Sequence, residues 1–80
     1  MTVTVLLFAS YADTLGTSEL ALDLADGATV SDALGHVRSL PGSERLPPQP
    51  LVAVNERYAQ RNQILKAGDQ VAIIPPVAGG

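Results

Sequence analysis

The sequence predicts a small α+β domain, in which a mixed sheet of four to five strands carries one main helix packed on one face. Two observations predict this class. Short apolar or alternating segments, typical of strands, lie toward both ends of the chain, and one amphipathic helical segment lies between them. With 80 residues the chain is long enough for a single domain, so we assign residues 1–80 to one unit with residues 75–80 as an extended C-terminal tail.

The first part of the chain shows strand and helix signals in turn. Residues 3–8 are apolar on both faces, as expected of an inner strand. Residues 9–15 predict a short helical turn closed by Gly16, because glycine suits the left-handed position after a helix. Residues 18–24 carry a leucine at every second position, which predicts a half-buried antiparallel strand and a hairpin-like pair with the first strand.

The main helix is predicted to begin after Thr29. Asp32 stands three residues later, which resembles a capping box with Asp in place of the usual Glu. Apolar residues then recur at helical spacing at Val30, Ala33, Leu34, Val37 and Leu40. Gly35 inside this run costs about 1 kcal/mol relative to Ala, and Pro41 with Gly42 is expected to stop the helix.

The last part of the chain returns to strand signals. The proline-rich residues 41–50 predict extended and irregular structure. Residues 51–54 predict a short apolar strand, Asn55 and Glu56 a turn, and residues 70–74 a last strand. The order strand, strand, helix, strand, strand is that of a β-grasp fold.

Composition excludes several classes of function. The net charge is -3 and the five basic residues are scattered, so we expect no nucleic-acid partner. No apolar run approaches the roughly 18 residues of a membrane span, and the N-terminus lacks the basic region of a signal peptide. We therefore expect a cytoplasmic protein with no membrane partner. Without cysteine and with one histidine, His36, no metal site is expected.

The end of the chain suggests chemistry of its own, because two prolines are followed only by small residues. This segment consists of Pro75, Pro76, Val77, Ala78, Gly79 and Gly80. The prolines lack an amide hydrogen, so the last strand must stop and the chain leaves the sheet as a stiff strut. Gly79 and Gly80 have no Cβ, so the end can thread a narrow channel and present the Gly80 carboxylate there.

A carboxylate is a poor electrophile and needs a better leaving group, such as AMP, before it can act as an acyl donor. The chain has no phosphate-binding loop and no nucleophile–base pair, so a separate activating enzyme is implied. The alternative interpretation is a simply frayed terminus, since last residues are commonly small and loose.

A partner that takes the tail must also grip the surface beside it. If the first and last strands are neighbours, Phe8 and Ile74 lie near their ends and point to the same side. Together with Tyr58 they form the predicted partner-binding patch at the base of the tail. The alternative is that Phe8 and Ile74 are core residues of a sheet that is apolar on both faces.

Three segments resemble one known family. Residues 68–80 read Gly-Asp-Gln-Val-Ala-Ile-Ile-Pro-Pro-Val-Ala-Gly-Gly and resemble the end of the small subunit of molybdopterin synthase, in the MoaD/ThiS sulfur-carrier family of ubiquitin-like β-grasp proteins. Residues 5–9 and residues 53–55 resemble the first and third strands of that family. The chain departs at residues 12–13, where many members carry Arg-Glu, and at residues 41–50, which match no known pattern of the family.

The resemblance implies a sulfur-carrier cycle. An E1-like adenylyltransferase using ATP and Mg would activate the Gly80 carboxylate, and a sulfur donor, a sulfurtransferase or cysteine desulfurase, would convert it to a thiocarboxylate. The tail would then enter the large subunit of molybdopterin synthase and donate sulfur to cyclic pyranopterin monophosphate, which forms the molybdopterin dithiolene. This chain would bind no cofactor and would be a non-catalytic sulfur-donor subunit of a heterotetramer.

Three other functions stay open. The same chemistry could serve thiamin or another thio-metabolite. A ubiquitin-like modifier would be conjugated through Gly80, although Lys66 is the only lysine, which weakly disfavours a polymeric tag. A non-catalytic β-grasp binding module would have no use for a free Gly-Gly end.

Overall fold

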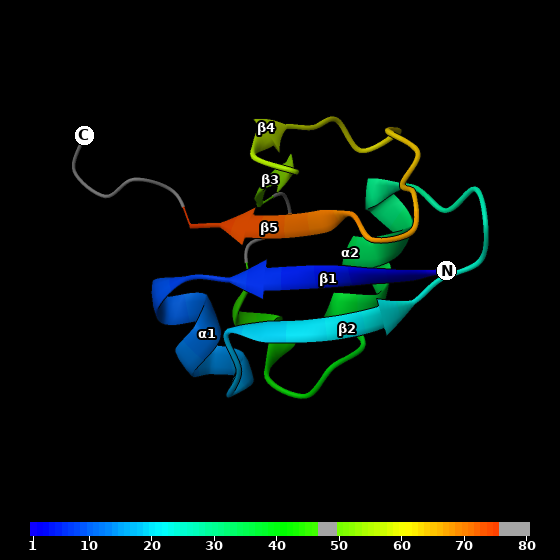
Figure 1. Ribbon diagram of the computed structural model, residues 1–80. Helices are drawn as coiled ribbons and strands as arrows, with labels where there is room; N and C mark the ends of the chain where they lie inside the picture. The colour runs from blue at the N-terminus through cyan, green and yellow to red at the C-terminus, as the bar shows by residue number, and fades with distance from the viewer. Residues whose placement is uncertain (47–49, 76–80) are drawn as a thin grey trace.

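The computed structural model describes residues 1–46 and 50–75. One mixed sheet carries a helix across one face and a second, shorter helix at one end (Figure 1). The elements in chain order are β1 (Thr2–Leu7), α1 (Ala9–Leu15), β2 (Glu19–Asp23), α2 (Val30–Arg38), the 3-10 helix η1 (Ser43–Arg45), β3 (Leu51–Val54), β4 (Arg57–Tyr58) and β5 (Gln70–Ile74).

The first and last strands of the chain, β1 and β5, are direct neighbours in the sheet, as the predicted partner-binding patch requires. The sheet has five strands in the order β2-β1-β5-β3-β4. Its centre is the parallel pair β1 and β5, in which Leu7 stands opposite Ile73. The pairs β1–β2, β3–β5 and β3–β4 are all antiparallel. The chain segment that follows β5 therefore leaves from the middle of the sheet, between β1 and β3.

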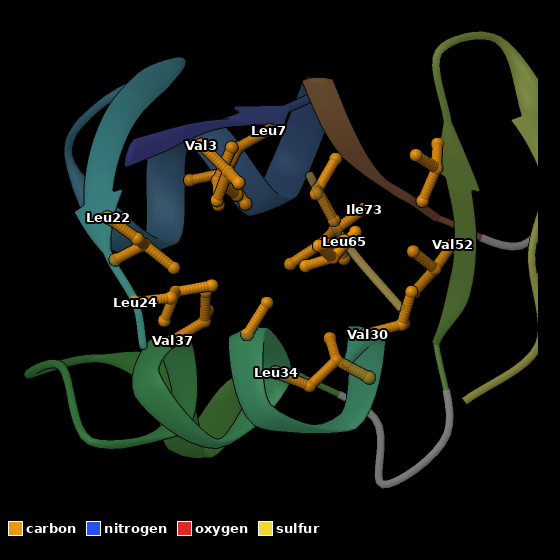
Figure 2. Packing of buried hydrophobic residues seen from close by; sticks show 14 of the residues in the cluster. Val3, Leu7, Leu22, Leu24, Val30, Leu34, Val37, Val52, Leu65 and Ile73 are labelled. Atoms are coloured by element: carbon orange, nitrogen blue, oxygen red, sulfur yellow. The ribbon is translucent and has the colours of Figure 1, made fainter. Parts of the chain in front are cut away.

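The hydrophobic core lies between one face of this sheet and α2 (Figure 2). Burial alternates along β1 and β5 because successive strand side chains point to opposite faces. The fully or nearly fully buried residues of these strands and of α2 are Val3, Val5, Leu7, Val71, Ile73, Val30, Ala33 and Val37. Each valine, leucine or isoleucine in such a position contributes about 1.5–3 kcal/mol relative to an exposed one. No helix formed by residues 1–46 or 50–75 covers the second face of the sheet.

The beginning of α2 is fixed by the predicted capping box. The Asp32 amide donates to the Thr29 hydroxyl oxygen at 3.3 Å, and the Thr29 amide donates to an Asp32 carboxylate oxygen at 2.9 Å. These two bonds satisfy amide groups that would otherwise have no partner at the helix start. The helix ends at Arg38, so Leu40 of the predicted apolar stripe lies beyond it and is half-buried.

The first helix also follows its prediction. It spans Ala9–Leu15 and ends at Gly16, whose φ of 77° is the left-handed conformation expected there. The Gly16 amide donates to the Ala12 carbonyl oxygen at 2.8 Å. Phe8 is not part of the strand that was predicted to include it, because β1 ends at Leu7 and Phe8 is the residue that enters α1.

Residues 41–50 are less irregular than their prolines suggest. Ser43–Arg45 form the 3-10 helix η1, and the buried Ser43 hydroxyl donates to the Arg38 carbonyl oxygen at 2.6 Å. The expectation of irregular structure was wrong for these residues, while residues 47–49 lie outside the described part of the chain. Among the described residues, no helix is long and apolar enough to cross a membrane.

Candidate functional site

The uncovered face of the sheet carries a row of side chains that runs across four strands. Leu6 of β1 stands opposite Ala72 of β5, Ala72 opposite Ala53 of β3, and Ala53 opposite Tyr58 of β4. Directly opposed residues of neighbouring strands point to the same face of a sheet. The alternation that buries Leu7 in the core therefore places this whole row on the other face of the sheet.

A hollow of about 330 Å³ lies over this row. Its floor includes the alanine side chains of Ala53 and Ala72, which are shorter than their neighbours. The complete lining consists of Leu6, Phe8, Ala53, Glu56, Tyr58, Gln70, Ala72 and Ile74. Because most of these side chains are apolar, the hollow favours an apolar occupant.

All three residues of the predicted partner-binding patch line this hollow. Phe8 is 46% exposed and Tyr58 76% exposed, while Ile74 is half-buried. The alternative interpretation of Phe8 and Ile74 as core residues was wrong, because both lie on the face that α2 does not cover. The structure thus brings Phe8, Tyr58 and Ile74 together, and their role in binding stays a prediction.

The tail begins at one end of the hollow. The strand β5 ends at Ile74, as predicted, and the half-buried Pro75 follows it outside the sheet. In Figure 1, β5 ends on the same side of the molecule as β1 and α1. The other predicted tail residues lie outside the described part of the chain: Pro76, Val77, Ala78, Gly79 and Gly80.

Leu51 and Glu56 are among the residues of this surface that were not assigned to it from the sequence. Leu51 is 47% exposed and stands opposite Ile74, so it extends the apolar surface beyond the hollow. Its two-residue spacing from Ala53 is the sequence signal that would have placed it on this face. Glu56 was recognised only as a turn residue, yet it is the single charged residue in the lining of the hollow.

The described residues offer surfaces for binding. Across residues 1–46 and 50–75, no three His, Asp or Glu side chains gather in a group that could hold a metal ion. His36 is exposed on α2 and lies on the opposite side of the molecule's core from the hollow. The arrangement can hold a partner against the sheet at the point from which the tail extends.

A central parallel strand pair flanked by antiparallel strands, with a helix across one face, defines a β-grasp domain, here one with an apolar hollow beside its C-terminal tail. Residues 5–80 match the ThiS family, and the chain belongs to this family.

Similar proteins agree with that assignment. The molybdopterin synthase sulfur carrier subunit of Chlamydomonas reinhardtii is 36% identical over 83 aligned positions, which cover 100% of both chains. The crystal structure of SAMP1, the small archaeal modifier protein 1 of Haloferax volcanii, has a TM-score of 0.87 at 31% identity and 100% coverage of both chains. A chain from the complex of subunits 1 and 2 of the molybdopterin-converting factor of Helicobacter pylori has a TM-score of 0.76 over 100% of both chains. At 21% identity, that likeness shows the fold.

Proposed function

We propose that this chain is the sulfur-carrier small subunit of a molybdopterin synthase. The observation that carries the proposal is the likeness to the sulfur carrier subunit of Chlamydomonas reinhardtii, which extends over the full length of both chains. The β-grasp sheet supports it, because β5 ends beside an apolar hollow and leads directly into the Gly-Gly tail.

The working group in this proposal is the carboxylate of Gly80. An E1-like enzyme transfers AMP from ATP to this carboxylate and releases pyrophosphate, with Mg bound by that enzyme. The outer sulfur of a persulfide on a sulfurtransferase or cysteine desulfurase then displaces AMP and forms an acyl disulfide with Gly80. A second thiol, of the donor or of a small-molecule reductant, cleaves this acyl disulfide, which leaves a thiocarboxylate on Gly80 and a disulfide on the thiol side. The thiocarboxylate sulfur is a nucleophile, and its acyl group is later released to water, so the carrier is recovered with its original carboxylate.

The short tail limits where the partner must sit. Five residues follow Pro75, and even a fully extended chain spans no more than about 3.6 Å per residue, or about 18 Å in all. A partner whose reactive centre receives Gly80 must therefore contact the domain close to the end of β5. Phe8 and Ile74 are the apolar residues at that end of the hollow, and we assign to them and to Tyr58 the contact with the large synthase subunit.

Mass spectrometry of the protein purified from its own host tests the proposal. The expected result is a fraction of the intact chain in which one oxygen is replaced by sulfur, together with a large molybdopterin synthase subunit that co-purifies. A thiocarboxylate without that subunit, but with an enzyme of thiamin synthesis instead, would assign the carrier to another sulfur pathway.

The likeness to SAMP1 favours one second candidate, a protein modifier joined through Gly80 to lysine side chains. Digestion of host proteins with a protease, followed by mass spectrometry, would reveal lysines that carry the C-terminal residues of this chain. Finding such conjugates and no thiocarboxylate would replace the synthase proposal by this one.

A further inference from the structure

The turn between β3 and β4 holds an acidic residue in a backbone conformation that disfavours it. Asn55 and Glu56 have φ values of 50° and 72°, both in the left-handed region. Turns of this kind prefer glycine at the second position, because a side chain there is strained by its Cβ. Asparagine tolerates the conformation well, whereas glutamate does not. Glu56 therefore occupies a position where the fold alone favours glycine.

This turn is firmly attached to the sheet. The Asn55 amide donates to the Gln70 carbonyl oxygen at 2.9 Å, and the Gln70 amide donates to the side-chain oxygen of Asn55 at 3.0 Å. The side-chain nitrogen of Asn55 donates to an Asp69 carboxylate oxygen at 2.9 Å. These three bonds hold the backbone of Glu56 in place beside the start of β5, so its side chain projects from a fixed point.

The backbone strain of positive φ angles at non-glycine residues is concentrated around the hollow. Within the described ranges, the non-glycine residues with positive φ are Ala9, Asn55 and Glu56. Ala9 directly follows Phe8 at one end of the hollow, and the turn forms the other end. Backbone strain of this sort persists where the surrounding structure enforces it, and it collects at functional sites.

The charge of Glu56 has no partner inside the described domain. Within residues 1–46 and 50–75, its carboxylate takes part in no hydrogen bond or ion pair, and the hollow has no basic residue in its lining. Gln70 and Ile74 are four residue steps apart along β5, at about 3.3 Å per step, so Glu56 and the tail lie at opposite ends of a surface about 13 Å long. An apolar hollow alone binds without a preferred direction, whereas a single charge at one end defines one.

We infer that Glu56 is an orientation-determining docking residue, whose carboxylate pairs with a basic side chain of the large synthase subunit at the end of the hollow opposite the tail. This inference rests on the proposed function, which supplies the partner. The ion pair and the threaded tail fix two separated points, so the domain can dock in only one direction along β5. The strain at Glu56 is retained because glycine at this position would remove the charge.

The test compares Glu56→Gly, Glu56→Gln, Glu56→Asp and Glu56→Lys in the full chain. Glu56→Gly is expected to raise the melting temperature by about 4 °C, because it relieves the left-handed strain. Its affinity for the purified large synthase subunit of the same genome, measured by calorimetry at about 0.05 M salt, should fall about three- to tenfold. Glu56→Gln should bind as weakly without the gain in stability, Glu56→Asp should keep most of the affinity, and Glu56→Lys should bind most weakly.

Salt and a matched control distinguish a local contact from a general effect of charge. Raising the salt to about 0.5 M should weaken the wild-type complex more than the Glu56→Gln complex. Asp26→Asn removes the same charge in the loop between β2 and α2, where the carboxylate side chain is 98% exposed, and should leave affinity unchanged. An equal loss of affinity in Asp26→Asn would overturn the inference.

Phe8→Asp separates this inference from the function on which it rests. If Phe8→Asp abolishes binding while all four Glu56 variants bind like the wild type with the same salt dependence, the inference alone is wrong. If the wild-type chain does not bind the large subunit, the proposed function is wrong and the inference with it.

Discussion

Ala53 and Ala72 stand directly opposite each other in the antiparallel pair of β3 and β5, on the face of the sheet that α2 does not cover. Their neighbours in the same row are Leu6 and Tyr58, whose side chains are much larger. Two short side chains between longer ones create the floor of the hollow. The shape of this surface therefore depends on a pair of methyl groups as much as on the aromatic rings around them.

Filling the hollow is predicted to block docking without harming the fold. In Ala72→Leu the added carbon atoms occupy space outside the core, so the free energy of unfolding should change by less than about 0.5 kcal/mol, while affinity for the large synthase subunit falls at least about tenfold. Urea unfolding and calorimetry measure the two effects. The control is Ala33→Leu, because Ala33 is buried under the sheet and overpacking there should cost about 1–3 kcal/mol. Unchanged affinity in Ala72→Leu would remove the hollow from the docking surface.

Deletion of Gly80 is predicted to abolish sulfur transfer and to leave stability unchanged within about 0.5 kcal/mol. The deletion leaves the carboxylate one residue short of the place that the partner's reactive centre requires. Thermal unfolding and an in vitro assay of dithiolene formation measure the two properties. Lys66→Arg, which removes the only lysine and keeps its charge, should transfer sulfur normally. A large loss of stability on deletion would mean that the terminus is structural.

Two glycines are predicted to respond to alanine with opposite signs. Gly42 has a φ of 90°, and a Cβ there would lie 2.7 Å from the Thr14 carbonyl oxygen, so Gly42→Ala should reduce the free energy of unfolding by about 2–4 kcal/mol. Gly35 lies inside α2, where an added Cβ would meet no atom of a neighbouring segment within 4 Å, so Gly35→Ala should raise it by up to about 1 kcal/mol. Urea unfolding measures the free energy of unfolding of both variants. A Gly35→Ala variant that is less stable than the wild type would show that the added Cβ does meet a neighbouring atom.

Removal of the helix cap is predicted to weaken the whole domain. Thr29→Ala leaves the Asp32 amide without its hydroxyl partner and should lower the free energy of unfolding by about 1 kcal/mol. Thr29→Ser keeps the hydroxyl group and should be close to the wild type. If both variants lose the same amount, the methyl group of Thr29 rather than its hydrogen bond supports the helix.

Local signals in the sequence were enough to predict most elements. The leucines spaced by two residues predicted β2, Thr29 with Asp32 predicted the start of α2, and Gly16 predicted the end of α1. Each of these signals acts within a few residues of the chain, because a cap or an alternating strand is defined by its immediate neighbours. The apolar patch at Phe8 and Ile74 followed from strand parity once β1 and β5 were assumed to pair.

Features that depend on distant segments could not be predicted in the same way. The two-residue strand β4 carries no apolar repeat and exists because it pairs with β3. The hollow requires Ala53 and Ala72 to be opposed, which depends on the register of strands that are far apart in the chain. Glu56 gained its significance only when the turn was found at the end of the hollow, since an exposed glutamate in a turn is ordinary in a sequence.

The central position of β5 has a mechanical consequence. A pull on the residues that follow Ile74 acts lengthwise along β5, which is bonded to β1 on one side and to β3 on the other. The force then acts parallel to β5, so the hydrogen bonds that join β5 to β1 and to β3 must break together. A force that pulled an edge strand sideways would break its hydrogen bonds one at a time. If the tail enters a narrow channel of a partner, as proposed, the folded domain would stay outside the channel, and the length of the tail would set how far Gly80 reaches into it.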